Sequence, residues 1–154
     1  MPRAVSPAVG VLLLTAVTLV LASAVAVVAV DLVPGSPQRE PVALSADADA
    51  GAGRVTVVLV SGPTVDVRRV QVRISVGGTR LRHQPPVPFT GARGFLGAPS
   101  GPFNRAADPR WEVGERASLR IAGTNDPPLS AGSTVLVEVY RDGHALARVE
   151  VTAT

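Results

Sequence analysis

The sequence predicts an amino-terminal transmembrane α-helix followed by an all-β antiparallel sandwich. Two observations support this fold class. From Ala8 to Val30 no residue carries a charge, and from Arg54 onward apolar residues alternate with polar ones, as they do in strands with one buried face. Outside one long loop the strand-like segments recur about every 8–12 residues, a spacing that is typical of a β-sandwich.

The uncharged stretch is long enough to cross a bilayer. Its 23 residues, Ala8 to Val30, would form a helix about 35 Å long, against a hydrocarbon thickness of about 30 Å. Ser6 is a favourable N-cap and Pro7 suits a first helical turn, so we expect the helix to begin there. Arg3 precedes the stretch and Asp31 follows it, which favours a cytoplasmic amino terminus and an exterior carboxyl-terminal domain.

Small residues recur along one side of this predicted helix at spacings of three and four. They are Thr15, Thr18, Ala22, Ala26 and Ala29. Because such stripes let helices pack closely, this side suits a neighbouring helix, while the leucines that lie mostly off the stripe suit lipid. The alternative interpretation is that the stripe only reflects the Ala and Val content that is common in membrane helices.

The residues at the start of the stretch resemble the amino terminus of archaeal type IV pilins. Arg3-Ala4-Val5-Ser6-Pro7 joins a short basic leader to the apolar run Ala8-Val9-Gly10-Val11-Leu12-Leu13-Leu14. The resemblance implies that a membrane prepilin peptidase cleaves between Ala4 and Val5. The leader is only four residues long, and Ala4 stands where Gly is commoner. Bacterial pilins carry a Glu where this chain has Val9, which fits the archaeal branch better.

Two other uses of the apolar stretch remain open. A secretory signal could be cleaved near Ala22, Ala24 or Ala26, but the apolar core of such a signal has only about 7–15 residues. A plain single-pass anchor has the observed length. A lipid-modified lipoprotein is excluded, because the sequence contains no cysteine.

Composition divides the chain into four parts. We expect a leader over 1–4, the hydrophobic helix of membrane and filament core over 5–30, and a linker over 31–53 that could hold a short first strand. The extracellular β-sandwich would occupy 54–154. Archaeal pilins and archaellins pair an apolar helix with such a head, so the resemblance implies an archaellin-like, immunoglobulin-like sandwich.

Hairpin signals fix parts of the expected register. A strand over 65–76 precedes the two-residue turn Gly77-Gly78. At Asp142-Gly143 a two-residue turn would mix the buried and exposed faces of the two strands. We therefore expect a longer turn with Gly143 in a bulge, which pairs Val139 with Ala145 and Val135 with Val149.

The turn at Gly77-Gly78 also predicts a cluster of arginines. Its register sets Arg73 opposite Arg82, with Arg80 and Arg69 close by on the outer face, although like charges that face each other across strands are unfavourable. One interpretation is a surface patch that binds an acidic polymer, a surface or a neighbouring subunit. The other is an ordinary solvated face.

Residues 84–110 are rich in proline and glycine and show no periodicity, which predicts a long surface loop of the kind that often forms an interaction surface. We expect Phe89, Phe95 and Phe103 to attach this loop to the sandwich. Trp111, at the start of the return strand, should anchor in the core.

The sequence offers no recognisable catalytic, cofactor-binding or metal-binding group. His83 and His144 lack neighbouring carboxylates at ligand spacing. Asp47 and Asp49 fit a solvated linker better than a weak Ca²⁺ contact. A net charge of +3 is too small to indicate nucleic-acid binding. We expect a protein that is not an enzyme.

These observations and the resemblance predict a structural subunit of an archaeal type IV pilus-like surface filament, involved in adhesion. It would sit in the cell membrane with its head outside and then join an extracellular pilus. The implied partners are other copies and other pilin subunits, prepilin peptidase, a membrane assembly platform with its ATPase, and membrane lipid. The alternative is a single-pass, membrane-anchored extracellular β-sandwich binding protein that does not polymerise.

Overall fold

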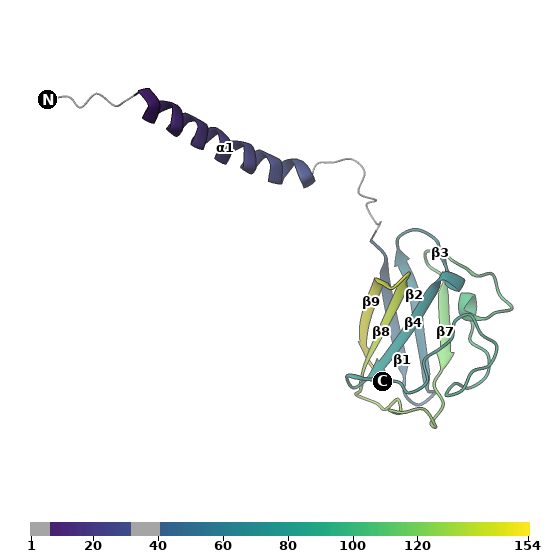
Figure 1. The fold of residues 1–154 in the computed structure, drawn as a ribbon. Coiled ribbons are helices and arrows are strands. Elements are labelled where there is room, and N and C mark those ends of the chain that lie inside the picture. The colour runs from purple at the N-terminus through teal and green to yellow at the C-terminus, as the bar shows by residue number, and fades with distance from the viewer. Residues whose placement is uncertain (1–6, 32–40) are drawn as a thin grey trace. The chain divides into compact units, whose positions relative to one another are not determined.

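The structure, a computed structural model, describes residues 7–31 and 41–154, with side chains described for 7–22 and 41–154. The chain forms two compact units, Met1–Arg39 and Glu40–Thr154. The described residues of the first form the helix α1, Pro7–Asp31 (Figure 1). The predicted processing residues Ala4 and Val5 and the predicted N-cap Ser6 lie outside the described residues. In the part of the chain that the structure describes, no helix is both long and apolar enough to cross a membrane.

The second unit is an antiparallel β-sandwich. One sheet has the order β1-β2-β7, the other β5-β4-β8-β9, and a short pair joins β3 to β6. The strands are β1 (Ala43–Asp49), β2 (Arg54–Ser61), β3 (Val65–Asp66), β4 (Val70–Val76), β5 (Thr79–Arg80), β6 (Arg110–Trp111), β7 (Arg116–Arg120), β8 (Thr134–Arg141) and β9 (His144–Thr152). Two 3₁₀ turns, η1 (Val67–Arg69) and η2 (Gly101–Phe103), lie between strands.

Alternating side chains of both sheets meet in one apolar core. In β2 the buried residues are Val55, Val57 and Leu59, and in β8 they are Val135, Val137 and Val139. Because successive side chains of a strand point to opposite faces, the residues between them are left on the outer faces. The period-two pattern of the sequence therefore predicted the buried positions of these strands correctly.

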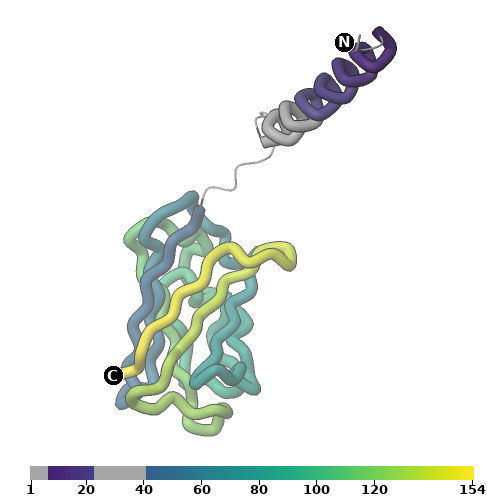
Figure 2. Tube along the Cα trace, turned by 90° about the vertical axis from the view of Figure 1, so that its left-hand side faces the viewer, coloured from purple at the N-terminus to yellow at the C-terminus, as the bar shows by residue number. Residues whose placement is uncertain are grey.

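The sandwich begins before residue 54. The compact unit starts at Glu40, and β1 pairs with β2 from Ala43 opposite Ser61 to Asp49 opposite Arg54. The segment over 31–53 that was expected as a linker with a possible short first strand thus contains a seven-residue strand. The last residue of the chain also holds β1, because Ala50 N donates to Thr154 O and Thr154 N donates to Ala48 O, each at 2.9 Å. Figure 2 shows β1 and the end of β9 side by side there.

The strand that was predicted over 65–76 is interrupted. Asp66 accepts a hydrogen bond from Arg68 N at 3.0 Å and caps η1, which separates β3 from β4. A carboxylate that accepts from the backbone two residues on favours a turn over a continuing strand. This local bond explains why apolar periodicity alone did not find the break.

The register predicted for the last hairpin is wrong. Asp142 and Gly143 form a two-residue turn, both with positive φ (51° and 80°), and Arg141 lies opposite His144. A bulge between Val139 and Tyr140 then shifts the register, so that Val139 faces Ala147. The extra residue on β9 restores the apolar alternation that a regular ladder would have lost.

The long loop is attached by aromatic side chains, as predicted. Phe89, Phe95, Phe103 and Trp111 are all at least nine-tenths buried. Phe89 and Phe95 pack with ring centroids 5.6 Å apart. The loop therefore belongs to the sandwich core.

Candidate functional site: the apolar helix and an arginine-lined hollow

Large apolar side chains cover the described surface of α1. The exposed fractions are 68%, 60% and 73% at Leu12, Leu13 and Leu14, and 55% and 71% at Val17 and Leu19. At 3.6 residues per turn these side chains point to different sides of the helix. A helix that is apolar all round is normally surrounded by lipid or by other apolar helices. Its surface is therefore unsuited to remain in water.

The two threonines of α1 have hydrogen bonds within the helix. Thr15 Oγ1 donates to Val11 O at 2.9 Å and to Leu12 O at 3.0 Å. Thr18 Oγ1 donates to Leu14 O and, at 3.3 Å, to Thr15 O. Because the hydroxyl groups bond to the preceding turn, they add no unsatisfied polar group to an apolar surrounding.

Of the predicted small-residue stripe, Thr15, Thr18 and Ala22 lie among the residues with described side chains, and Ala22 is exposed. Ala26 and Ala29 fall within α1, but their side chains lie outside the described residues. The helical repeat of 3.6 residues per turn places the stripe on one side of α1. Its use in packing against another helix stays a prediction.

Residues 3–44 match the family model for the amino-terminal part of archaeal type IV pilins. The amino-terminal region of this chain is therefore similar to that of archaeal type IV pilins. The match contains the whole of α1 and ends in the first residues of β1. Pilins are structural proteins, so the pilin segment indicates a subunit of an assembly. Comparison with curated proteins finds no significant match for the chain.

The four arginines that were predicted to cluster have different neighbours in the β-sandwich. Arg73 lies opposite Glu138, with its guanidinium carbon 4.4 Å from the ring centroid of Tyr140. Arg82 pairs with Asp126 at 3.1 Å, and Arg69 approaches Asp142 at 4.0 Å. Arg80 ends β5 and is exposed.

The expected pairing of Arg73 with Arg82 fails because the hairpin stops early. Gln84 takes the place of a strand neighbour, since its Oε1 accepts from Ile74 N at 2.7 Å and its Nε2 donates to Ile74 O at 2.9 Å. Arg82 N then donates to Asp126 O at 2.7 Å, which leads the chain away from β4.

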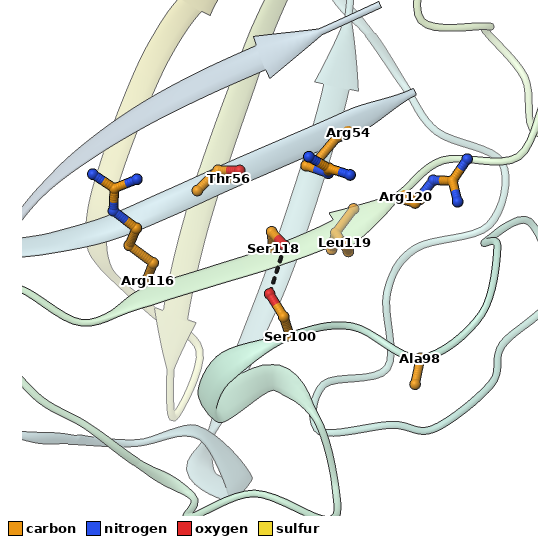
Figure 3. Close-up of a pocket in the computed structure, with 8 residues that line it drawn as sticks. All are labelled: Arg54, Thr56, Ala98, Ser100, Arg116, Ser118, Leu119 and Arg120. Atoms are coloured by element: carbon orange, nitrogen blue, oxygen red, sulfur yellow. Dashed lines mark hydrogen bonds between the residues drawn. The ribbon is translucent and has the colours of Figure 1, made fainter. Parts of the chain in front are cut away.

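A different set of arginines gathers on the outer face of the β1-β2-β7 sheet. Arg54 from β2 and Arg116 and Arg120 from β7 line a hollow of about 430 Å³. The other lining residues are Thr56, Ala98, Ser100, Ser118 and Leu119. In Figure 3 the guanidinium groups of Arg54 and Arg120 lie at one end, Arg116 lies at the other, and the hydroxyl residues lie between them.

The long loop forms one wall of this hollow. Ser100 N donates to Ser118 O at 2.8 Å and Ser118 N donates to Ser100 O at 3.2 Å. The two serine hydroxyls are 2.6 Å apart. Next to them Gly101 has a φ of +66°, and a Cβ there would lie 2.0 Å from Arg116 O. Only glycine fits this approach, so the loop is held closely against β7.

Sequence reasoning missed this group because its members are far apart in the chain. The alternation of apolar and polar residues in the sequence does indicate that Arg54, Arg116 and Arg120 face solvent. What was missing was the pairing of β2 with β7, which aligns Arg54 with Arg120.

Among the described residues, no group of three or more histidine or acidic side chains could hold a metal ion.

Proposed function

We propose that this protein is a structural subunit of a type IV pilus-like surface filament, anchored in the cell membrane through α1 before assembly. The observation that carries the proposal is a helix with apolar side chains on all described sides and its threonine hydroxyls bonded internally. The pilin match over residues 3–44 contains this helix. The 23 uncharged residues from Ala8 to Val30 have the length of a membrane-spanning segment, although among the described residues no helix is both long and apolar enough to cross a membrane.

Assembly would exchange one apolar surrounding for another. In the membrane the leucines of α1 contact lipid, and in a filament they contact the helices of neighbouring copies and of other pilin subunits. Because this exchange changes little in transfer free energy, close packing along Thr15, Thr18, Ala22, Ala26 and Ala29 would supply the specificity.

Prepilin peptidase, a membrane platform and its ATPase would carry out processing and export. The sandwich head, of the archaellin-like or immunoglobulin-like type, would face outward and take part in adhesion.

The amino terminus of the mature protein tests the processing step. We expect mass spectrometry of the protein from membranes and from sheared filaments to give a terminus at Val5. Ala4→Gly, which introduces the commoner residue of the family, should preserve cleavage, and Ala4→Glu should block it. A terminus at Met1 or Pro2 would indicate a plain anchor, and one near residues 25–31 would indicate a removed secretory signal.

Electron microscopy of cells with and without the gene tests assembly itself. Filaments that disappear on deletion and return on complementation support the proposal. The second candidate, a membrane-anchored binding protein that does not polymerise, is favoured by the arginine-lined hollow of the head. Cells that display the protein in the membrane but never form filaments would favour it.

A further inference from the structure

We propose that the arginine-lined hollow, formed by Arg54, Arg116 and Arg120 with the hydroxyl residues between them, binds the anionic groups of an acidic polysaccharide. This binding needs only the folded head. It does not depend on filament assembly, and the two proposals can fail separately.

The pairing of β2 with β7 sets two positive charges face to face. Arg54 lies directly opposite Arg120 in the antiparallel register, and both side chains are exposed on the same face. Residues in such positions have their Cβ atoms about 4.5–5.5 Å apart, and like charges there are unfavourable. An anionic group between the two guanidinium groups would relieve this repulsion and accept hydrogen bonds from both.

The arginines of the hollow have no ion-pair partner among the described residues, whereas three other arginines of the head do. Arg68, Arg69 and Arg82 each lie within 4.0 Å of a carboxylate. Within the described residues no carboxylate lies that close to Arg54, Arg116 or Arg120. Arg120 uses its Nε to donate to Ala52 O at 3.3 Å, which fixes the stem of the side chain and leaves the terminal nitrogens for a ligand.

The spacing of the charges favours a polymer over a small anion. Arg116 and Arg120 are four residues apart on β7, so their Cα atoms are separated by about 13 Å along the strand. A single sulfate or phosphate cannot contact both ends of the hollow. A chain with anionic groups repeated at about this spacing can do so.

The residues between the charges favour a carbohydrate over an acidic peptide. Thr56, Ser100 and Ser118 offer hydroxyl groups, which can both donate and accept hydrogen bonds, as the hydroxyl groups of a sugar require. The Ser100 and Ser118 hydroxyls bond to each other, which leaves one donor and several acceptor positions between them. The wall at Ser100 is fixed by its paired backbone bonds to Ser118, so little ordering is needed on binding.

Two carboxylates limit the site on one side. Asp49 lies opposite Arg54 and Asp47 lies opposite Thr56, both on β1. Asp49 Oδ1 accepts from Ala52 N at 2.9 Å. An anionic chain should therefore run over β2 and β7 and avoid β1.

Binding measurements with the full chain in non-ionic detergent test the proposal. The probes are heparin and polygalacturonate, which separate sulfated from carboxylated sugars, with poly-glutamate as the peptide and dextran as the neutral sugar. In about 0.1 M salt we expect at least one acidic polysaccharide to bind, more weakly as salt rises. Poly-glutamate and dextran should bind at least tenfold more weakly.

Two double variants that each remove two positive charges distinguish binding in the hollow from attraction by the net charge of the protein. Arg54→Ser with Arg120→Ser should weaken binding by about tenfold or more, because charge-assisted bonds from both arginines are lost. The matched control, Arg69→Ser with Arg80→Ser, should weaken it by less than about twofold. Asp47→Asn with Asp49→Asn should strengthen it. Thermal unfolding of each variant verifies that the head remains folded.

Three results would overturn the proposal. The first is the absence of binding to both acidic polysaccharides. The second is an equal loss in the control pair, which would indicate attraction by net charge alone. The third is poly-glutamate binding as tightly as the sugars, which would assign the hollow to an acidic peptide. Each of these results leaves the filament proposal intact, because filaments are scored separately by microscopy.

Discussion

Phe103 and Trp111 pack edge to face, with ring centroids 5.2 Å apart and an angle of 71° between the ring planes. Both are 1% exposed. Trp111 Nε1 also donates to Glu115 O at 2.9 Å, so its polar atom is satisfied. One partner sits at the end of η2 and the other in β6, and the pair therefore joins the long loop to the sandwich.

Removing one ring of this pair should destabilise the head. Phe103→Ala is expected to lower the free energy of unfolding by about 3–5 kcal/mol, because it leaves a cavity in a packed site. Urea denaturation followed by Trp111 fluorescence measures the change. The control is Leu96→Ala in the same loop, where the side chain is 46% exposed and the expected change is within about 0.5 kcal/mol. Equal effects of the two variants would contradict the anchoring role.

Asn125 holds two loops together through its side chain. It is 3% exposed. Its Oδ1 accepts from His83 N at 3.0 Å, and its Nδ2 donates to His83 O at 2.9 Å and to Gly94 O at 3.2 Å. Asn125→Ala should cost about 1–3 kcal/mol for each backbone group left unsatisfied in the interior. Hydrogen exchange should show faster exchange at His83 N, and an unchanged rate there would refute this role.

The turn of the last hairpin depends on a residue with positive φ. Asp142 has a φ of 51°, a conformation that asparagine adopts more readily than β-branched residues do. Asp142→Val is therefore expected to destabilise the head by about 1–2 kcal/mol. Asp142→Asn should be nearly neutral, although it removes the 4.0 Å contact with Arg69. If the asparagine variant lost as much stability as the valine variant, the charge and not the backbone would be responsible.

Asp66 should titrate below the usual range of an aspartate. The side-chain hydrogen bonds from Arg68, at 3.0 and 2.9 Å, lower the pKa of the Asp66 carboxyl, and the bond from Arg68 N lowers it further. A lowered folded-state pKa means that the ionised carboxylate stabilises the fold above its unfolded-state pKa. This contribution disappears as the pH falls through the folded-state value. NMR titration should show the low pKa, and Arg68→Ala should return it towards the ordinary value.

Bulk on the small-residue stripe should block filaments without preventing membrane insertion. Ala22→Leu with Ala26→Leu keeps the helix apolar but holds neighbouring helices apart. We expect normal amounts of protein in membrane fractions and no filaments in micrographs. Val17→Leu adds bulk on the opposite side of α1 and is the control, with filaments expected. Filaments of normal number from the alanine variants would show that the stripe is not a packing surface.

Most strands of the head could be predicted from the sequence, because alternation of apolar residues reflects burial directly. The paired Val137 and Val149 show the limit of this reasoning. Their alignment depends on a bulge at Tyr140 that restores the apolar alternation after a two-residue turn. The alternation indicated that a bulge was needed but not where it lies. Similarly, the first hairpin ends where the side chain of Gln84 takes the backbone hydrogen bonds of Ile74, and no sequence pattern indicated this contact.

The binding surface was harder to predict than the fold. Arg73 and Arg82 are near in sequence, and a simple hairpin would have joined them. Arg54 and Arg120 are brought together only by a long-range strand pair, which depends on how the whole sheet is ordered. A charge cluster of this kind depends on the order of the strands in the sheet. Strand order is difficult to predict from a single sequence, because it depends on contacts between residues far apart in the chain.

The attachment of β1 bears on how the head would carry mechanical load. A pull transmitted along the chain from the amino-terminal unit reaches the sandwich at β1, which is paired with β2 from Ala43 to Asp49. The hydrogen bonds of an antiparallel pair lie perpendicular to the strands, so tension along β1 strains the bonds of the ladder together and does not peel them one by one. Tension applied parallel to β1 would therefore load this ladder in shear.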